Sequence, residues 1–280
     1  MTAVLVSATD LAEELVGDRP PVVLDVRWSL GGSDLNSYRA GHIPGALFVD
    51  LDRELAAPVG DGSLGRHPLP APADLQATWR RVGIRKGDSV VVYDDRDSSA
   101  AARAWWLLRW SGLRDVRVLD GGIAAWDAAG LRIKAGDGTP LVPGDVKVKP
   151  GSMPTVDADA AGSLAAAGAL VDARAAARYR GETEPIDPVA GHIPGSVNVP
   201  FSTLVDADGR FKPVADLQSA FAAAGVRPGM TAAASCGSGV TACHLILAGA
   251  AAGIDLALYP GSWSQWCALG RPVETSSASA

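Results

Sequence analysis

The part of the chain that most constrains its architecture lies in the second half and reads Ala232-Ala233-Ala234-Ser235-Cys236-Gly237-Ser238-Gly239-Val240-Thr241-Ala242-Cys243-His244. A run of small residues, a Gly-x-Gly turn and an apolar helical pattern that ends at Gly253 predict a strand, a tight loop and a helix. Cys236 is then at the end of the strand, with loop amides and the amino end of the helix directed at its sulfur. Such groups favour an anion. We therefore predict a thiolate nucleophile at Cys236 rather than a buried structural cysteine.

The chain contains two copies of one pattern, offset by about 150 residues. A Gly-His-Ile-Pro-Gly turn occurs twice, and an apolar-Asp-x-Arg run precedes each copy of it: residues 24–27 with 41–45, and 171–174 with 191–195. Further along, Asp94 follows an apolar run in the first copy at the position that Cys236 takes in the second. Landmarks in the same order indicate a duplicated domain, of which only the second copy carries the cysteine.

Each copy alternates short apolar runs with helical patterns. In the first copy, a helix is expected to open at Ser7-Ala8-Thr9-Asp10, with further helices over 74–82, 100–110 and 123–129 and strands over 22–26, 90–93 and 116–119. This alternation predicts an α/β fold with two tandem domains, each a mostly parallel sheet flanked by helices. Ligand sites in such sheets lie at the carboxyl ends of strands, where Cys236 is predicted to be.

The domain bounds follow from the repeat and from a stretch rich in Gly and Pro between its copies. We expect an N-terminal domain over residues 1–137, an irregular linker over 138–153, a C-terminal domain over 154–275 and a frayed tail over 276–280.

The composition excludes several classes of partner. The chain has 280 residues, enough for two cores, and its net charge of −6 argues against nucleic acid. No apolar run is long enough to span a membrane, and the N-terminus does not read as a signal peptide. Three cysteines, Cys236, Cys243 and Cys267, do not form a disulfide framework and lack the spacing of a metal site. A reducing cytoplasm fits best, with Cys243 and Cys267 as packing residues.

With these motifs in place, the chain resembles the tandem-domain rhodanese family, the thiosulfate and 3-mercaptopyruvate sulfurtransferases. The Asp-x-Arg run, the Gly-His-Ile-Pro-Gly turn in both halves and the loop from Cys236 to Thr241 carry the resemblance, which covers nearly the whole length. It implies a catalytic C-terminal domain and an inactive N-terminal copy, in line with Asp94 in place of a cysteine. It implies no metal and no organic cofactor.

The resemblance gives opposite indications about the sulfur donor. Thiosulfate enzymes of the family typically carry an Arg-Lys pair where this chain has Gly237 and Ser238, which favours 3-mercaptopyruvate. Mercaptopyruvate enzymes usually offer two arginines to the substrate carboxylate. Arg178 matches the first, but no arginine occurs at 184–187, where the second is expected. The missing arginine favours thiosulfate:cyanide sulfurtransferase or a mixed activity, with a mercaptopyruvate-preferring enzyme as the alternative.

The expected chemistry is a double displacement. Cys236 takes a sulfur atom from the donor, a persulfide forms, and cyanide, a small thiol or a protein thiol removes the sulfur. The amides of Gly237, Ser238, Gly239, Val240 and Thr241 would stabilise the anionic sulfur.

Side chains around the loop have paired interpretations. Ser238 and Thr241 offer hydroxyl groups to the sulfur or substrate, with helix capping as the alternative for Thr241. Arg178 is expected to bind the anionic end of the donor, with a surface arginine as the alternative. For Arg180, a surface arginine is the preferred interpretation.

Two residues of the first half are further candidates. His42 occupies the Gly-His-Ile-Pro-Gly turn, as His192 does in the other copy. Because both copies keep the histidine, an architectural role is favoured. The resemblance also suggests that His42 contributes to the active site from the N-terminal domain, with Asp34 as a weaker candidate of the same kind.

The sequence argues against three other classes of protein. A cysteine phosphatase needs an arginine six positions after the cysteine, where this chain has Ala242. A papain-like hydrolase needs a histidine base, and His244 is too close in sequence to serve. A non-enzymatic sulfur carrier or regulatory binding module is the remaining alternative, and an intact nucleophile in a glycine-rich loop argues against it.

Overall fold

A computed structural model describes residues 3–138 and 142–276 of the chain. It divides into two compact units: unit 1 comprises Met1–Ala57, Leu69–Met153 and Asp206–Phe211, and unit 2 comprises Pro58–Pro68, Pro154–Val205 and Lys212–Ala280. The expected domains are contiguous in sequence, whereas each unit includes a short segment from the other half. Of the expected tail, residues 277–280 lie outside the described part of the chain.

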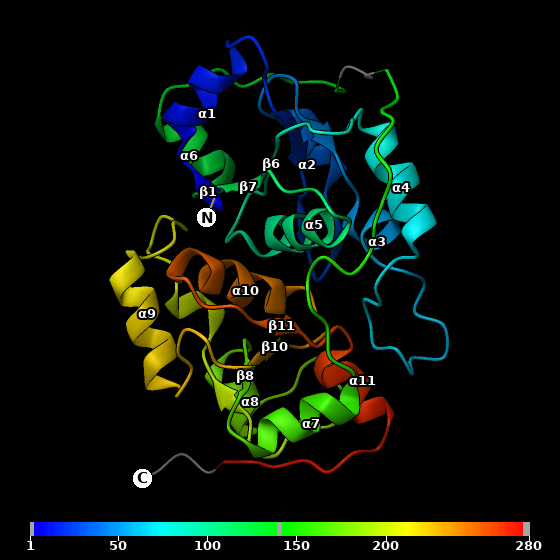
Figure 1. Cartoon of the computed structure of the whole chain (residues 1–280), viewed down its shortest axis with the longest axis vertical. Coiled ribbons are helices and arrows are strands. Elements are labelled where there is room, and N and C mark those ends of the chain that lie inside the picture. The colour runs from blue at the N-terminus through cyan, green and yellow to red at the C-terminus, as the bar shows by residue number, and fades with distance from the viewer. Residues whose placement is uncertain (1–2, 139–141, 277–280) are drawn as a thin grey trace. The chain divides into compact units, whose positions relative to one another are not determined.

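Unit 1 is an α/β unit around a five-stranded parallel sheet in the order β1-β7-β6-β2-β5 (Figure 1). Its strands are β1 (Leu5–Val6), β2 (Val22–Asp25), β5 (Leu47–Phe48), β6 (Val90–Tyr93) and β7 (Val116–Leu119), with a small antiparallel ribbon of β3 (Trp28–Ser29) and β4 (Gly32–Ser33). Its helices are α1 (Ala8–Leu15), α2 (Leu35–Ala40), α3 (Leu51–Glu54), α4 (Pro72–Arg81), α5 (Ser99–Trp110) and α6 (Gly122–Ala128).

Unit 2 repeats the arrangement with a four-stranded parallel sheet in the order β11-β10-β8-β9. Its strands are β8 (Leu170–Asp172), β9 (Val197–Asn198), β10 (Ala233–Ser235) and β11 (Ala257–Leu258). Its helices are α7 (Ala158–Ala166), α8 (Ala176–Arg180), the 3₁₀ turn η1 (Phe201–Thr203), α9 (Val214–Ala223), α10 (Thr241–Ala252) and α11 (Ser262–Ala268).

The duplication is visible in the sheets. In chain order, β2, β5, β6 and β7 of unit 1 correspond to β8, β9, β10 and β11 of unit 2, and they pair in the same order. Each Gly-His-Ile-Pro-Gly turn is tied to its unit by an antiparallel bridge, His42 with Lys134 and His192 with Glu274. The predicted fold class, two mostly parallel α/β domains, is confirmed.

Local sequence explains the boundaries of several elements. Ser7 caps α1 by accepting a hydrogen bond from the amide of Asp10 at 3.1 Å. The helix expected at 74–82 begins two residues earlier, because Pro72 fits the first helical turn, where its missing N–H costs nothing. Gly253 ends α10 in the left-handed conformation with φ of 77°.

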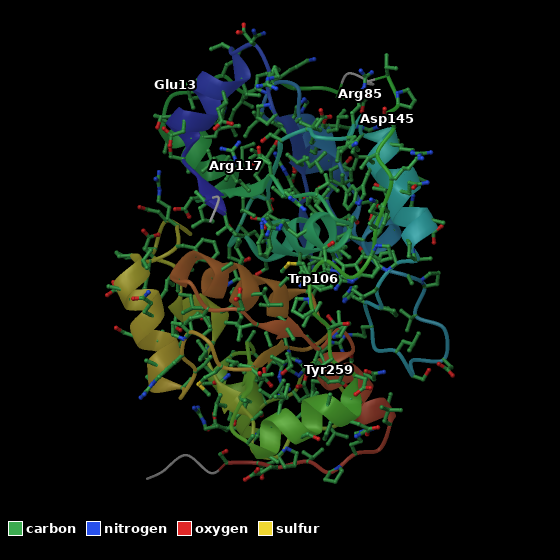
Figure 2. All side chains as sticks on the ribbon, viewed as in Figure 1. Glu13, Arg85, Trp106, Arg117, Asp145 and Tyr259 are labelled. Carbon is green, nitrogen blue, oxygen red and sulfur yellow. The ribbon has the colours of Figure 1, made fainter. Side chains whose placement is uncertain are left out.

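Each unit has its own hydrophobic core. In unit 1, Val91 and Tyr93 project from one face of β6 and pack with Leu11 and Trp126 of the flanking helices. In unit 2, Tyr259, which is labelled in Figure 2, belongs to the core. It packs with Trp263 among the residues of α7 and α11. No helix in the described residues has the length and apolar character needed to cross a lipid bilayer.

Asp94 directly follows β6 in unit 1 and is buried with 2% exposure. Its carboxylate accepts four backbone hydrogen bonds, each 3.1 Å long, from Arg96, Ser98, Ala100 and Ala101 at the start of α5. The loop that follows β6 is therefore an anion cradle, and in this unit the chain's own side chain fills it.

Replacing Asp94 with asparagine is expected to destabilise the protein by about 1–3 kcal/mol, because an amide NH₂ would face backbone donors and leave them without an acceptor. Chemical denaturation measures the change. The exposed Asp127 of α6 offers a matched control, for which the same substitution should stay within about 0.5 kcal/mol. Equal stability of the two variants would contradict the cradle.

Candidate active site

The sulfur of Cys236 lies directly after β10 and is held by amides of its own loop. Its Sγ accepts hydrogen bonds from the amides of Ser238 at 3.4 Å and Gly239 at 3.1 Å. The cysteine itself is fixed at both ends, since its N–H donates to Ser262 Oγ at 3.0 Å and its carbonyl accepts from the amide of Trp263 at 3.0 Å. These loop amides point at the sulfur rather than at internal carbonyl groups, an arrangement that stabilises a negative charge on it.

The two units thus place different groups in equivalent cradles. Asp94 follows β6 and accepts amides that include those of Ala100 and Ala101 in the first turn of α5, and Cys236 follows β10 and accepts the amides of the loop before α10. In unit 1, burial and the nearby Asp97 raise the pKa of Asp94 to about 7, and the amides of Ala101, Arg96 and Ser98 oppose that rise. The cradle amides therefore favour the ionised form against the cost of burying it.

Gly239 makes the cradle possible. Its φ is +81°, and a Cβ built there would lie 2.3 Å from the carbonyl oxygen of Pro260. A side chain would have to displace backbone, which is costly in a buried turn.

Substituting alanine for Gly239 is therefore expected to cost about 1–3 kcal/mol of stability and to lower activity more than about ten-fold, since the amide that faces Sγ would turn away. Denaturation and turnover measured together test this. The matched control is Gly253→Ala, where φ is also positive at +77° but no atom lies within 4 Å of the added Cβ. That variant should lose stability and keep its activity. Full activity in Gly239→Ala would contradict the cradle.

Two guanidinium groups lie beside Gly237, the residue that follows the cysteine. A Cβ built on Gly237 would lie 3.0 Å from Nη2 of Arg66, and 3.8 and 3.9 Å from the two Nη atoms of Arg178. The side chains of Arg66 and Arg178 are 29% and 18% exposed, so solvent reaches these cations. Cys236 itself is only 2% exposed.

Buried carboxylates hold the two arginines together. Asp187 forms ion pairs with both Arg66 and Arg178, the latter at 3.3 Å. Glu184 accepts from Arg178 at 2.6 Å and lies 3.5 Å from Nη1 of Arg174. Burial acts to raise the pKa of Glu184, but the hydrogen bond from Arg178 and those from nearby amides outweigh it, so that the pKa lies below its usual value. Burial raises the pKa of Asp187, although Arg66 opposes the shift.

Arg66 and its neighbour His67 come from the segment Pro58–Pro68, which belongs to unit 2. Nδ1 of His67 lies 2.7 Å from Oγ of Ser238, a hydrogen-bond distance. The segment is fixed by the Arg66 amide, which donates to Ser264 Oγ at 3.1 Å, and by Gln265 Nε2, which donates to Ser63 O at 2.8 Å.

Sequence reasoning missed both residues. His67 and Ser238 are 171 positions apart, and Arg66 and Asp187 are 121 apart. Neither Arg66 nor His67 belongs to a repeated motif or to the stretch before the second Gly-His-Ile-Pro-Gly turn. A contact at this separation depends on the tertiary fold, and no local pattern announces it.

Three further residues considered from the sequence are Val240, Thr241 and Arg180. Val240 occupies the N-cap position of α10 and Thr241 its first turn, with no side-chain cap. Arg180 is 35% exposed and pairs with Glu182 at 2.6 Å, as expected of a surface arginine.

His42 and Asp34 both lie in unit 1 and make structural contacts there. His42 is fully buried, with Nδ1 3.0 Å from Tyr38 O and its ring stacked on Tyr38 at a centroid distance of 4.2 Å. His192 repeats this contact in unit 2, where it stacks on Tyr179 at 3.8 Å. Asp34 caps α2 by accepting from the amide of Ser37 at 2.9 Å. A contribution of His42 or Asp34 to catalysis stays a prediction.

The remaining cysteines differ in environment. Cys243 is buried in α10, where its Sγ donates to Gly239 O at 3.3 Å. Burial raises the pKa of Cys267 to about 11, which makes it a poor nucleophile. Within residues 3–138 and 142–276, no three His, Cys, Asp or Glu side chains gather as a metal site would require.

The geometry defines a class: an α/β protein that holds a cysteine sulfur in an anion cradle at the carboxyl end of a parallel strand. A family model described as "Rhodanese-like domain" matches residues 7–129 and 157–269. The chain belongs to the rhodanese family, with two copies of its domain, and it is a sulfurtransferase of that family, as the sequence predicts.

Relatives span the whole chain. A probable 3-mercaptopyruvate sulfurtransferase of Pseudomonas aeruginosa is 48% identical over 98% of this chain and 99% of its own length. A putative thiosulfate sulfurtransferase of Mycobacterium tuberculosis is 44% identical over 98% of each chain. Among solved structures, a 3-mercaptopyruvate sulfotransferase from Escherichia coli is similar with a TM-score of 0.81 and 33% identity, over 94% of this chain and 99% of that one.

Proposed function

We propose that Cys236 carries a sulfur atom as a persulfide and that its preferred donor is 3-mercaptopyruvate. The observation that supports this most is the pair of guanidinium groups beside Gly237, next to a sulfur held by loop amides. Unit 1, with Asp94 in the corresponding cradle, has no nucleophile there and is proposed to be inactive.

The two arginines suit a donor with a carboxylate at one end and sulfur at the other. A guanidinium binds a carboxylate with a planar fork, and two of them share the charge. The absence of an arginine at 184–187 favours thiosulfate when the sequence is considered alone. Arg66 supplies a second guanidinium from another segment, so that reason no longer applies, and we infer a preference for the keto acid.

The proposed first half-reaction moves one sulfur atom from the donor to Cys236. The Cys236 thiolate attacks the thiol sulfur of 3-mercaptopyruvate, an S–S bond forms and the C–S bond breaks. The electron pair of that bond goes to the departing carbon, which takes up the proton of the donor thiol and leaves as pyruvate. The persulfide anion remains on the enzyme, where the loop amides stabilise its terminal sulfur.

The second half-reaction returns the cysteine to its thiolate form. A nucleophilic acceptor attacks the terminal sulfur of the persulfide, a bond from acceptor to sulfur forms and the S–S bond breaks. We propose a small thiol or cyanide as acceptor, with a protein thiol as a further candidate, and a reducing compartment such as the cytoplasm as the setting.

Ser238 and His67 are positioned to move the proton of the donor thiol. Ser238 is in the cradle and within hydrogen-bond distance of His67 Nδ1. A hydroxyl paired with an imidazole can accept a proton and deliver it to a developing carbanion.

Glutamine at position 67 keeps a hydrogen bond to Ser238 but cannot take up a proton. We expect His67→Gln to lower kcat by about a hundred-fold with little change in KM. Steady-state kinetics across pH test this. An unchanged kcat would show that His67 transfers no proton, and a rise in KM alone would assign it to binding.

Thiosulfate is the second candidate donor, because its double negative charge also suits two guanidinium groups. A side-by-side assay decides between them, with pyruvate release measured for 3-mercaptopyruvate and sulfite release for thiosulfate. We expect kcat/KM to be at least about ten-fold higher for the keto acid, the worth of one well-placed charged hydrogen bond. A higher value for thiosulfate would overturn the preference, and release of neither product would overturn the function.

A further inference from the structure

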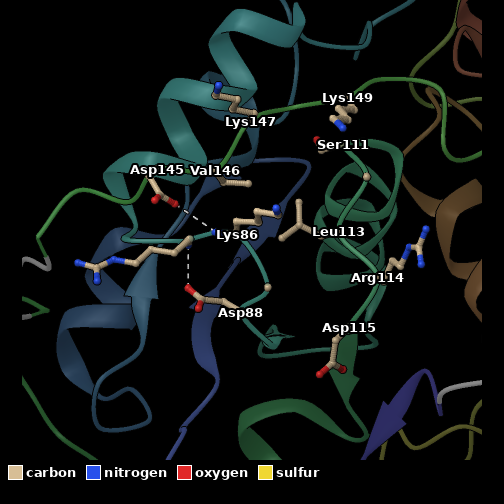
Figure 3. Close-up of a pocket in the computed structure, with 13 residues that line it drawn as sticks. Lys86, Asp88, Ser111, Leu113, Arg114, Asp115, Asp145, Val146, Lys147 and Lys149 are labelled. Atoms are coloured by element: carbon tan, nitrogen blue, oxygen red, sulfur yellow. Dashed lines mark hydrogen bonds between the residues drawn. The ribbon is translucent and has the colours of Figure 1, made fainter.

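A second candidate site lies in unit 1, which does not contain Cys236. A cavity of about 610 Å³ lies where β6 and β7 begin, lined by residues 85–88, 111–115, 145–147 and Lys149 (Figure 3). Asp94 follows the last residue of β6, so the cavity is at the opposite edge of the unit 1 sheet from the loop that holds Asp94. Its volume is in the range of small-molecule sites.

The cavity gathers positive charge in an acidic protein. The chain has five lysines, at 86, 134, 147, 149 and 212, and three of them line this cavity. Arg85 and Arg114 add two cations, against the three carboxylates of Asp88, Asp115 and Asp145. The lining therefore carries a net charge of +2, from five cations and three anions.

The carboxylates of the cavity interact with backbone amides or with another arginine. Asp88 Oδ2 accepts from the amide of Arg85 at 2.7 Å, and Asp145 Oδ1 accepts from the amide of Lys86 at 3.2 Å. Asp115 lies 3.7 Å from Nε of Arg117. In the described part of the chain, the ammonium groups of Lys86 and Lys149 have no ion-pair partner, so their charge is available to a ligand.

A buried hydroxyl completes the donor set. Ser111 lines the cavity and is only 1% exposed. Its Oγ accepts a hydrogen bond from Trp79 Nε1 at 3.1 Å, which leaves its own proton to donate. In Figure 3 it lies beside Lys149, and the side chain of Lys86 extends toward Leu113 in the same cavity. An apolar wall of Leu113 and Val146 flanks the donors.

We propose that this cavity binds a small molecule through a tetrahedral oxyanion group, a phosphate or a sulfate, held by Lys86, Lys149 and Ser111. The two ammonium groups are donors only, and their charges together neutralise a doubly charged oxyanion. The Ser111 hydroxyl, which already accepts from Trp79, adds its own proton as a third donor. The cavity exceeds the size of one such group, and its apolar wall accommodates the rest of the ligand. This proposal is independent of the donor preference at Cys236.

Inorganic phosphate and inorganic sulfate are the probes. Each is titrated at low ionic strength into the ¹⁵N-labelled full chain, and the amide shifts of Lys86, Gly112 and Lys149 are followed. We expect saturable shifts at these residues for at least one anion, weakened by added chloride. The anion that binds more tightly identifies the head group. Shifts that do not saturate, or that occur equally at Lys212, would overturn the proposal.

The double variant Lys86→Gln/Lys149→Gln is expected to weaken binding by at least about ten-fold, and Lys212→Gln in unit 2 to leave it unchanged. Lys86→Arg should retain binding, since it keeps the charge. Ser111 stays in place, because Trp79 depends on it. An unaltered melting temperature and sulfur-transfer rate show that the double variant is folded. Affinity equal to that of the unaltered protein would overturn the proposal.

Discussion

Serine at position 236 is expected to lower sulfur transfer by at least about a thousand-fold with either donor, because a hydroxyl is neither ionised near neutral pH nor able to form a persulfide. The loss should appear in kcat/KM and in the burst of pyruvate. Serine is slightly smaller and its oxygen still accepts the amides of Ser238 and Gly239, so the fold should persist. Circular dichroism and melting temperature check this.

Cys267→Ser is the matched control for this experiment. Its thiol lies in the same unit, and burial raises its pKa to about 11, so little thiolate is present near neutral pH. We expect turnover within about two-fold of the unaltered protein, in line with other changes away from the reacting groups. Substantial activity in Cys236→Ser, or its loss in Cys267→Ser, would assign the chemistry to another residue.

A second large loss of kcat/KM is expected when Arg66 is replaced. Arg66→Gln should lower kcat/KM for 3-mercaptopyruvate by about 10- to 100-fold, the worth of one hydrogen bond between charged groups. Because a carboxylate is bound in the ground state and the transition state alike, most of the loss should appear as a higher KM. Glutamine can still donate to Asp187, which limits the cost of leaving that carboxylate without its partner.

Two comparisons make the Arg66 experiment specific. Arg66→Lys keeps the charge without the planar fork and should have an intermediate KM. Arg180→Gln removes a surface arginine that pairs with the exposed Glu182 and should leave KM unchanged. An unchanged KM in Arg66→Gln would remove the main support for the keto-acid preference, while the role of Cys236 would stand.

Much of this architecture follows from local pattern. The apolar run 90–93 is β6, as predicted. Asp94 occupies in unit 1 the position that Cys236 has in unit 2, because the loop after the strand directs its amides at the side chain in both copies. The strand, loop and helix around Cys236 were also predictable, since Gly239 and Gly253 have the positive φ angles for which glycine is suited.

What could not be predicted depends on which segment joins which unit. The sequence lacks an arginine at 184–187, and from this alone a weaker carboxylate site was inferred. The segment Pro58–Pro68 is part of unit 2, where Gly65 has φ of +86° and a Cβ there would lie 2.7 Å from Gly261 O. This close approach brings Arg66 and His67 to Cys236, and no periodicity or motif in the first half encodes it.

The most direct test of the central claim is the mass of the peptide that contains Cys236 after a brief exposure to 3-mercaptopyruvate without acceptor. Formation of the covalent intermediate predicts a gain of about 32 Da, one sulfur atom, on that peptide. Addition of cyanide should remove it, and peptides with Cys267 should show no gain. Pyruvate release with an unchanged mass at Cys236, or with the added sulfur on another cysteine, would contradict the account.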